Sequence, residues 1–275
     1  MEPFVTDLNP HGQQMADESM IRTLAAQTEA IWPQEVEIIK RYGLSGNLRI
    51  LDGGCGTGEA SSRLAALFPQ ASVLGVDIID NSLEIARTRY PSLAPRLAFE
   101  RRSLFELGLE DNAFDLTACR HVLHSIPHAA LVIAELVRVT RSGGRLHLIP
   151  EDYDMIHFQS GTRDLRTFWH DIPAKFGAAT GTDLYVGRNT VSILLELGLE
   201  EIKVDYVIVD TLRVPREVFA TIMTAWRDGY AEPTAQVANM TTAEAIAHFD
   251  QMIANIHDPR GYAVWMVPVL SARKP

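Results

Sequence analysis

Short apolar runs alternate with segments of helical periodicity through the middle of the chain. Strands are predicted at 48–53, 72–77, 97–102, 113–119 and 144–150, and helices at 58–68, 81–89 and 129–139. The apolar runs have the length of strands buried in a sheet. Because strands and helices alternate, we expect a mostly parallel sheet with helices on both faces. This is an α/β fold, in which ligands bind at the carboxyl ends of the strands.

The regions on either side follow looser patterns. Residues 1–12 are typical of an irregular arm, and helical spacing runs from Asp17 to Tyr42 with a break near Trp32 and Pro33. After residue 150, helices are predicted at 162–180, 187–198, 215–229 and 241–256, with a turn-rich stretch around Pro233. Late strands at 201–210 and 262–272 complete a set of seven and suit an antiparallel sheet edge.

Four glycines occupy six positions, 53 to 58, between the first predicted strand and its helix. Glycine accepts positive φ and lets a ligand approach the backbone, and a helix N-terminus favours electron-rich groups. The spacing is acid-x-Gly-x-Gly-x-Gly, with Asp52, Gly54, Gly56 and Gly58. A dinucleotide fingerprint needs Gly-x-Gly-x-x-Gly, which fits poorly, and no Gly-Lys-Ser/Thr follows for a P-loop.

A second acid ends the next predicted strand. Val73-Leu74-Gly75-Val76-Asp77 places a carboxylate nineteen residues after Gly58. A carboxylate at the tip of the second strand of such a sheet is positioned to accept both hydroxyls of a ribose. The two features together indicate a nucleoside-containing cofactor.

With these motifs, residues 45 to 150 resemble the class I S-adenosylmethionine-dependent methyltransferases. The block from Phe114 to His124 is similar to the family's fourth strand and following turn, and the block from Leu136 to Leu146 to its helix, glycine turn and fifth strand. The resemblance implies a Rossmann-like, mostly parallel seven-stranded sheet with an antiparallel edge strand, N-terminal helices and helical cap insertions. It also implies S-adenosyl-L-methionine as cofactor, with S-adenosyl-L-homocysteine as product.

The resemblance implies roles for individual residues. It assigns the methionine portion to Asp52, Gly53, Gly54, Cys55, Gly56 and Gly58, the ribose to Asp77, the adenine faces to Ile78 and Leu104, and the methionine side also to Arg120 and His121. Ser103 stands where the family often has an acid for the adenine amine, and we assign it the adenine edge. Residues 1–44 are then an arm with lid helices, or surface helices packed on the sheet. Residues 45–275 are the methyltransferase domain, with a helical substrate cover near 160–185 and 213–258.

Three histidines, His121, His124 and His128, follow the fourth predicted strand at helical spacing. Zinc or iron ligation is one interpretation, but Pro127 breaks the helical frame, and we predict no metal site. A base for the acceptor, most plausibly His124, is the second interpretation. The third interpretation is that the three histidines line the cofactor site or lie at the solvent-exposed start of a helix.

An acidic segment, Glu151-Asp152-Tyr153-Asp154, follows the fifth predicted strand at the same sheet edge. Asp152 and Tyr153 join His124 as candidate catalytic residues, Asp152 as a base and Tyr153 by stacking or hydrogen bonding. A solvated acidic turn is the alternative, since charge runs are usually exposed. A site for a divalent ion is the third interpretation of this segment. The aromatic residues of the later helices belong either to the core or, if they face the cleft, to a site for a planar or apolar acceptor.

The composition of the chain argues against some classes of partner and location. The net charge of −10 without a basic cluster argues against nucleic acid. Two cysteines, Cys55 and Cys119, fit a reducing cytoplasm. Residues 1–10 lack the apolar core of a signal peptide, and no run approaches the ~18 apolar residues of a membrane span. A homodimer stays open.

The sequence therefore predicts a cytoplasmic methyltransferase that transfers the methyl group to an O, N or C atom of a small molecule. Two alternatives are kept: a nicotinamide-dependent oxidoreductase on a similar fold, and a protein that binds the cofactor without catalysis. The acceptor is not specified by any of these patterns.

Overall fold

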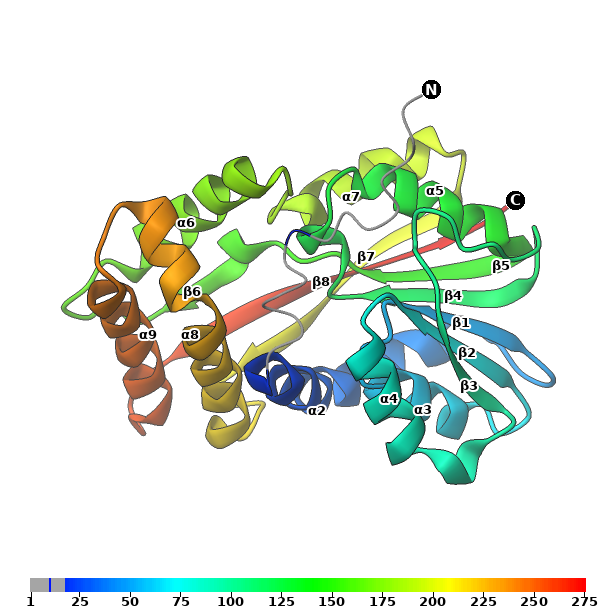
Figure 1. The fold of residues 1–275 in the computed structure, drawn as a ribbon, viewed down its shortest axis with the longest axis horizontal. Helices are drawn as coiled ribbons and strands as arrows, with labels where there is room; N and C mark the ends of the chain where they lie inside the picture. The colour runs from blue at the N-terminus through cyan, green and yellow to red at the C-terminus, as the bar shows by residue number, and fades with distance from the viewer. Residues whose placement is uncertain (1–9, 11–17) are drawn as a thin grey trace.

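The computed structural model describes residue 10 and residues 18–275, and one twisted sheet runs through that part of the chain (Figure 1). Its eight strands follow the order β3-β2-β1-β4-β5-β8-β6, with β7 paired to β8 outside that path. The first five strands of this order are parallel, and every pairing with β8 is antiparallel. The strands are β1 (Arg49–Gly53), β2 (Ser72–Asp77), β3 (Leu97–Arg101), β4 (Phe114–Arg120), β5 (Thr140–Ile149), β6 (Ile156–Phe158), β7 (Glu200–Asp210) and β8 (Ala263–Arg273).

The predicted mostly parallel sheet with an antiparallel edge is confirmed, with one strand more than the seven expected. The additional strand, β6, has three residues, too few for an apolar–polar alternation to be seen in the sequence. The predicted irregular arm at 1–12 lies outside the described residues, apart from residue 10.

Helices cover both faces of the sheet (Figure 1). α2, α3 and α4 lie on one face and α5 and α7 on the other, while α6, α8 and α9 gather at the far end of β6, β7 and β8. The α-helices are α2 (Glu18–Lys40), α3 (Glu59–Leu67), α4 (Asp80–Arg89), α5 (Ala129–Val139), α6 (Leu165–Thr180), α7 (Val186–Glu196), α8 (Arg216–Ala238) and α9 (Thr242–His257). Short 3-10 turns are η1 (Pro91–Leu93), η2 (Leu123–Ser125) and η3 (Tyr153–Met155).

The parallel strands are buried on both sides, which explains their nearly continuous apolar sequences. Successive residues of a strand point to opposite faces. Ile50 and Leu51 of β1 accordingly belong to two different apolar clusters, one beneath α3 and α4 and the other beneath α5 and α7. A third cluster joins α2, α6, α8 and α9 to β8 and contains the fully buried Trp265.

Two helices continue through prolines at which the sequence predicted interruptions. α2 contains Pro33 and α8 contains Pro233, so the predicted break near Trp32 and the predicted turn-rich stretch were wrong. A proline inside a helix removes one backbone hydrogen bond and crowds the preceding turn. Here α2 and α8 pack against each other, and Ala231 and Ala235, on either side of Pro233, pack with Ala245 of α9. Both helices are continuous within this tertiary packing.

β5 and β6 pair with the same side of β8, at its two ends. β5 reaches Leu148 opposite Leu270, and β6 begins at Ile156 opposite Trp265. The chain between them is longer than the part of β8 that it spans, so residues 150–155 bulge out of the sheet. This bulge lies at the carboxyl end of β5, where ligands bind in such sheets.

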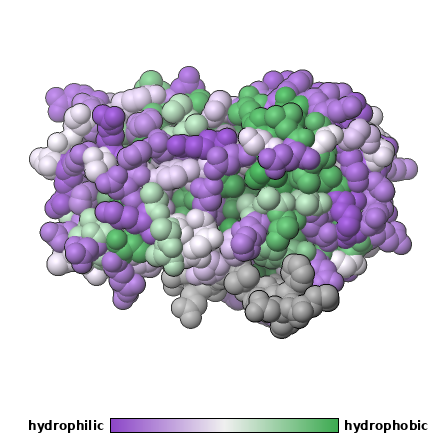
Figure 2. Space-filling model, turned by 90° about the horizontal axis from the view of Figure 1, so that it is seen from above, coloured by the Kyte–Doolittle hydropathy of each residue, from purple (hydrophilic) through white to green (hydrophobic). Residues whose placement is uncertain are grey.

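The surface has both polar and apolar areas. Figure 2 shows an apolar area among polar side chains on the face where Figure 1 places α5 and α7. The exposed apolar residues of these helices include Leu131 and Leu195. Of the helices in the described part, none combines the length and apolarity needed to cross a membrane. The domain boundary at residue 44 stays a prediction.

Candidate functional site

The loop after β1 requires glycine at two positions that face the site. Gly54 and Gly56 have φ of 72° and 52°, in the left-handed region. A Cβ atom on Gly54 would lie 2.2 Å from Val122 Cγ2, and one on Gly56 would lie 2.9 Å from Leu24 Cδ1. The backbone conformation therefore disfavours a side chain at both positions, and at Gly54 the closeness of Val122 adds to this. The bare backbone of the loop lines a cleft.

Asp77, at the end of β2, lies beside this loop. Its carboxylate accepts hydrogen bonds from the backbone N–H of Gly56 at 2.8 Å and of Ile79 at 3.0 Å. Burial raises the pKa of Asp77, and these hydrogen bonds lower it by a smaller amount. Each carboxylate oxygen has a second lone pair, so a half-buried Asp77 can still accept hydroxyl groups from a ligand.

Asp52 is buried at the end of β1, beneath the same loop. Its carboxylate accepts a hydrogen bond of 2.5 Å from the Ser61 hydroxyl on α3. Burial raises the pKa of Asp52, partly offset by that hydrogen bond. Asp52 also lines a small cavity together with Glu59 and Arg120, so both signs of charge surround it.

Arg120, at the end of β4, is tied to α2 by a buried ion pair. Its Nε and Nη2 atoms each donate to one oxygen of Glu35 at 2.7 Å. His147 Nε2 lies 2.9 Å from the Glu35 carboxylate, and the Tyr42 hydroxyl lies 2.6 Å from His147 Nδ1. Burial alone would raise the pKa of Glu35, but the charge of Arg120 and the bond with His147 lower it to about 2. This network anchors α2 over the sheet edge.

Three cavities meet beside α2. A cleft between β1, β2 and the turn after β3 is lined by Gly54, Gly56, Asp77, Ile78, Ser103 and Leu104, among others. The small cavity of Asp52 adjoins it. A larger one opens among the added helices. Leu24 and His121 line all three, so these two residues mark the point at which the cavities meet.

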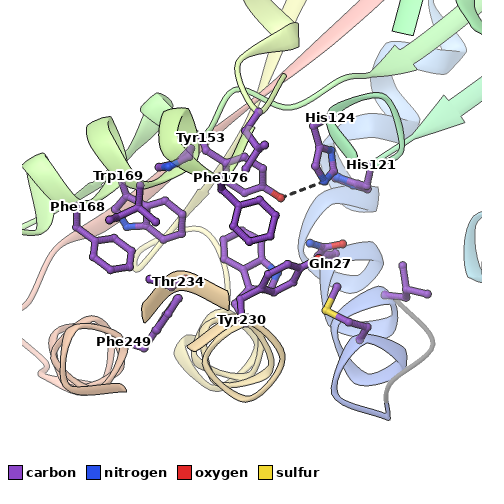
Figure 3. A pocket seen from close by; sticks show the side chains of 16 residues that line it. Gln27, His121, His124, Tyr153, Phe168, Trp169, Phe176, Tyr230, Thr234 and Phe249 are labelled. Atoms are coloured by element: carbon purple, nitrogen blue, oxygen red, sulfur yellow. Dashed lines mark hydrogen bonds between the residues drawn. The ribbon is translucent and has the colours of Figure 1, made fainter. Parts of the chain in front are cut away.

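The cavity among the helices is lined mainly by aromatic side chains (Figure 3). They come from α6, α8, α9 and η3, and are Tyr153, Phe168, Trp169, Phe176, Trp226, Tyr230 and Phe249. Tyr153 stacks on Trp169 with ring centroids 5.9 Å apart and meets Trp226 edge-on at 5.5 Å. The described residues lining this cavity include no Lys, Arg, Asp or Glu. We call it the aromatic cavity.

The residues of the bulge between β5 and β6 have different partners. Arg188 on α7 binds the buried carboxylate of Asp152 with both Nε and Nη2, at 2.7 and 2.6 Å. Asp152 thus does not line the aromatic cavity, whereas Tyr153 does. Glu151 is fully buried and hydrogen-bonds His121 Nδ1. The backbone of the bulge is held by the Gly187 N–H, which donates to the Glu151 carbonyl at 2.7 Å.

Tyr153 and His124 meet in the lining of the aromatic cavity (Figure 3). The Tyr153 hydroxyl lies 3.3 Å from His124 Nε2. The pKa of Tyr153 is raised well above its usual 10, first by burial and then by the charge of Glu151. Burial therefore favours the neutral phenol of Tyr153, which can donate or accept a hydrogen bond.

Most residues expected at the site lie around the three cavities. Of the expected cofactor residues, Gly53 and Gly58 do not line them: Gly53 is the last residue of β1, and Gly58 precedes α3. Their roles, like the others, stay predictions. The sequence did not single out Leu24 or Gln27 of α2, nor Val122, Ser125 and Ile126 in the cleft. The only sequence signal for Leu24 and Gln27 was the expectation that lid helices lie within residues 1–44.

The three histidines do not share a helix face. His121 and His128 have φ of 57° and 54°, so the chain turns at both, and His128 is exposed. Across residues 10 and 18–275, no group of three or more His, Cys, Asp or Glu side chains is arranged to hold a metal ion. Cys55 and Cys119 are both buried free thiols.

Comparison with known proteins gives one consistent result. Residues 44–175 match a family model described as a methyltransferase domain. The methyltransferase GfsG of Streptomyces halstedii is 34% identical over 141 residues, which is 50% of this chain and 49% of that protein. Trans-aconitate 2-methyltransferase of Methylobacterium nodulans is 33% identical over 132 residues, 48% of this chain and 49% of that protein. The chain thus spans about half the length of these curated relatives.

Solved structures give the same fold. Phosphoethanolamine N-methyltransferase 2 of Haemonchus contortus, in a complex with S-adenosyl-L-methionine, is 20% identical with a TM-score of 0.56. The similarity covers 89% of this chain and 53% of that one. The sheet order and the glycine loop with Asp77 agree with this match, so residues 44–175 form a methyltransferase domain with the fold of the class I S-adenosylmethionine-dependent enzymes.

Proposed function

We propose that this protein transfers a methyl group from S-adenosylmethionine to an O, N or C atom of an uncharged, largely apolar small molecule. The observation that carries the proposal is the junction at Leu24 and His121, where the cleft of the glycine loop meets the aromatic cavity. The empty space of each, with its open mouth included, is about 760 Å³.

The residues of the cleft fit the cofactor. The bare backbone at Gly54 and Gly56 admits a close ligand, and the spare lone pairs of Asp77 suit ribose hydroxyls. Ile78 and Leu104 offer apolar contact to a purine, with Ser103 at its edge. The cavity with Asp52, Glu59 and Arg120 presents both charges, as an amino-acid zwitterion requires. We propose these residues, with Cys55 and His121, as the cofactor site.

Bound S-adenosylmethionine supplies a methyl group activated by its sulfonium charge. The chain then has to align the acceptor atom and exclude water, and such positioning alone contributes up to ~7–11 kcal/mol. Leu24 on α2 covers the junction, and the Arg120–Glu35 pair keeps α2 in place. α2 is therefore proposed as the lid of the site.

The lining of the aromatic cavity selects the acceptor. A phosphate, carboxylate or ammonium group entering it would lose its hydration and find no side chain of opposite formal charge among the described lining residues. Aromatic rings favour planar or apolar ligands, and Gln27, His124, Tyr153 and Thr234 supply a few polar contacts. Tyr153 and His124 are proposed to orient the acceptor. Asp152 is not proposed for catalysis because Arg188 occupies its carboxylate.

The presence of a second cavity, lined by aromatic side chains, at the junction supports an enzyme over a protein that only binds the cofactor. The glycine spacing gives no support to the oxidoreductase alternative. A cytoplasmic location, the lack of nucleic-acid or membrane partners, and a homodimer stay predictions.

Ligand-dependent thermal stability and product release test the proposal together. S-adenosylmethionine and S-adenosylhomocysteine should raise the melting temperature, whereas NAD should not. Release of S-adenosylhomocysteine is then measured with neutral aromatic acceptors and with phosphorylated or carboxylated analogues of equal size. Turnover is expected with the neutral compounds. Stabilisation by NAD alone, or turnover confined to the charged analogues, would overturn the proposal.

A further inference from the structure

His121 and Glu151 form a buried pair at the ends of two neighbouring strands. His121 follows β4 and Glu151 follows β5, and the His121 N–H donates to the Ile149 carbonyl at 2.9 Å. Both residues have left-handed backbone conformations, with φ of 57° and 59°. His121 is 7% exposed and Glu151 is 0% exposed, and His121 Nδ1 hydrogen-bonds a Glu151 oxygen.

The second ring nitrogen of His121 has no hydrogen-bond partner within the described part of the chain, although it is buried. An unsatisfied buried polar atom costs about 1–3 kcal/mol, so it calls for a ligand that supplies the missing partner. His121 lines the cleft, the small cavity and the aromatic cavity at once. We therefore expect the hydrogen-bond partner of Nε2 to belong to a molecule bound where the three cavities meet.

The contact with Glu151 determines which nitrogen of His121 can accept a proton. A carboxylate on Nδ1 holds the proton of a neutral imidazole at Nδ1 and leaves the lone pair on Nε2. The same carboxylate stabilises the imidazolium that forms when Nε2 accepts a proton. His124, by contrast, already has Nε2 engaged with the Tyr153 hydroxyl. His121 lines the junction, and its Nε2 has no partner within the described residues.

We propose that His121 is the general base of the reaction, oriented by Glu151, and that the acceptor is an aromatic hydroxyl compound methylated on oxygen. This inference rests on the proposed function and narrows its acceptor. The acceptor's O–H proton goes to His121 Nε2, its oxygen forms the new O–CH₃ bond, and the electron pair of the broken C–S bond stays on sulfur. The proton then leaves His121 to solvent when product departs.

The rest of the aromatic cavity agrees with such an acceptor. A phenol presents an apolar ring and one dissociable proton, and the rings of Tyr153 and Trp226 in the lining of the cavity offer aromatic contact to it. Tyr153, held neutral by burial, can donate a hydrogen bond to an oxygen near His124. Glu151 contacts the acceptor only through His121 and acts as a positioning residue.

A pair of probes separates proton removal from all other steps. 2-Naphthol needs a base, whereas 2-naphthalenethiol ionises much more readily, since thiols are more acidic than phenols. Their methylation is measured with wild type, Glu151→Gln and His121→Asn, the last chosen because asparagine tolerates a left-handed backbone. Binding of S-adenosylhomocysteine is measured for each by calorimetry. His128→Asn, at an exposed histidine with φ of 54°, is the matched control.

We expect kcat for O-methylation to fall about 10²- to 10⁴-fold in both site variants, and kcat for S-methylation to fall far less. The control should change neither reaction. Loss of both reactions to the same extent, or of neither, would overturn the assignment. No turnover of 2-naphthol by a wild-type protein that binds S-adenosylhomocysteine would also overturn it. Failure of wild type to bind S-adenosylhomocysteine would instead contradict the proposed function itself.

A measurement on the wild-type protein does not depend on variants that fold. In the complex with S-adenosylhomocysteine, the ¹⁵N spectrum of histidine-labelled protein should show Nε2 of His121 without a proton and Nδ1 with one. The His121→Asn spectrum assigns the signal. A protonated Nε2 in the neutral ring would exclude a base at this position.

Discussion

At the scale of single residues, Asp77 combines a structural and a proposed binding role. Its carboxylate holds the glycine loop through Gly56 and remains partly open to the cleft. Because burial raises the pKa of Asp77, its ionised carboxylate lowers the free energy of unfolding. A group retained under that penalty is typical of functional sites.

Asp77→Asn should weaken binding of S-adenosylhomocysteine by roughly 10- to 150-fold, because hydrogen bonds to charged groups contribute about 1.5–3 kcal/mol. The melting temperature of the unliganded protein should change little, since loss of a desolvated charge offsets loss of one backbone contact. Calorimetry and thermal unfolding measure the two effects. Asp80→Asn, at a largely exposed carboxylate nearby, is the control. Unchanged affinity in Asp77→Asn would refute the ribose assignment.

At the scale of elements, α2 depends on one buried ion pair for its position over the site. Glu35 is fully buried among Arg120, His147 and the sheet, and its pKa falls from 4.5 to about 2. A lowered carboxylate pKa contributes stability that is fully present above the unfolded value, near pH 4.5. That contribution is lost as pH falls through about 2.

Glu35→Gln should lower the free energy of unfolding at pH 7 by about 3–5 kcal/mol, because Arg120 is left buried without its partner. Between pH 4.5 and 2, wild type should lose stability on the order of 3 kcal/mol more than the variant. Urea unfolding at several pH values measures both. Glu37→Gln, on the same helix with a 66% exposed side chain, should follow wild type. Parallel pH curves for wild type and Glu35→Gln would contradict this account.

At the scale of the whole molecule, cofactor and acceptor are proposed to occupy separate spaces joined at one point. The cleft is built by the parallel strands, and the aromatic cavity by helices packed around β8. Trp226 belongs only to the second: it is 4% exposed and its ring meets Tyr153, Trp169 and Trp265. Changes there should leave the cofactor site intact.

Trp226→Leu should lower the free energy of unfolding by up to about 3–5 kcal/mol, the range for loss of a large buried ring. Affinity for S-adenosylhomocysteine should stay within about twofold, since distant sites behave nearly independently. The KM of whichever neutral acceptor is turned over should rise. Trp32→Leu, in the apolar cluster beneath α3 and α4, is the control for stability loss alone. An equal loss of cofactor affinity in Trp226→Leu would show that the spaces are not separate.

Local patterns were sufficient for the parallel half of the fold. The apolar runs predicted β1 to β5 because strands buried on both faces need uninterrupted apolar residues. The glycine spacing and Asp77 predicted where the cleft lies, since positive φ demands glycine and parallel strands end at one edge. Such features depend on neighbours in sequence, and the sheet topology follows from them by general rules.

The tertiary structure alone decided the rest. Pro33 and Pro233 do not end their helices, which pack against each other and, for α8, also against α9. The partners Glu35 and Arg120, and His121 and Glu151, are brought together only when the strands and α2 pack. The aromatic cavity likewise arises because rings from four separate elements converge on one space. These outcomes require side-chain directions and long-range packing, which the period of apolar residues along a chain does not contain.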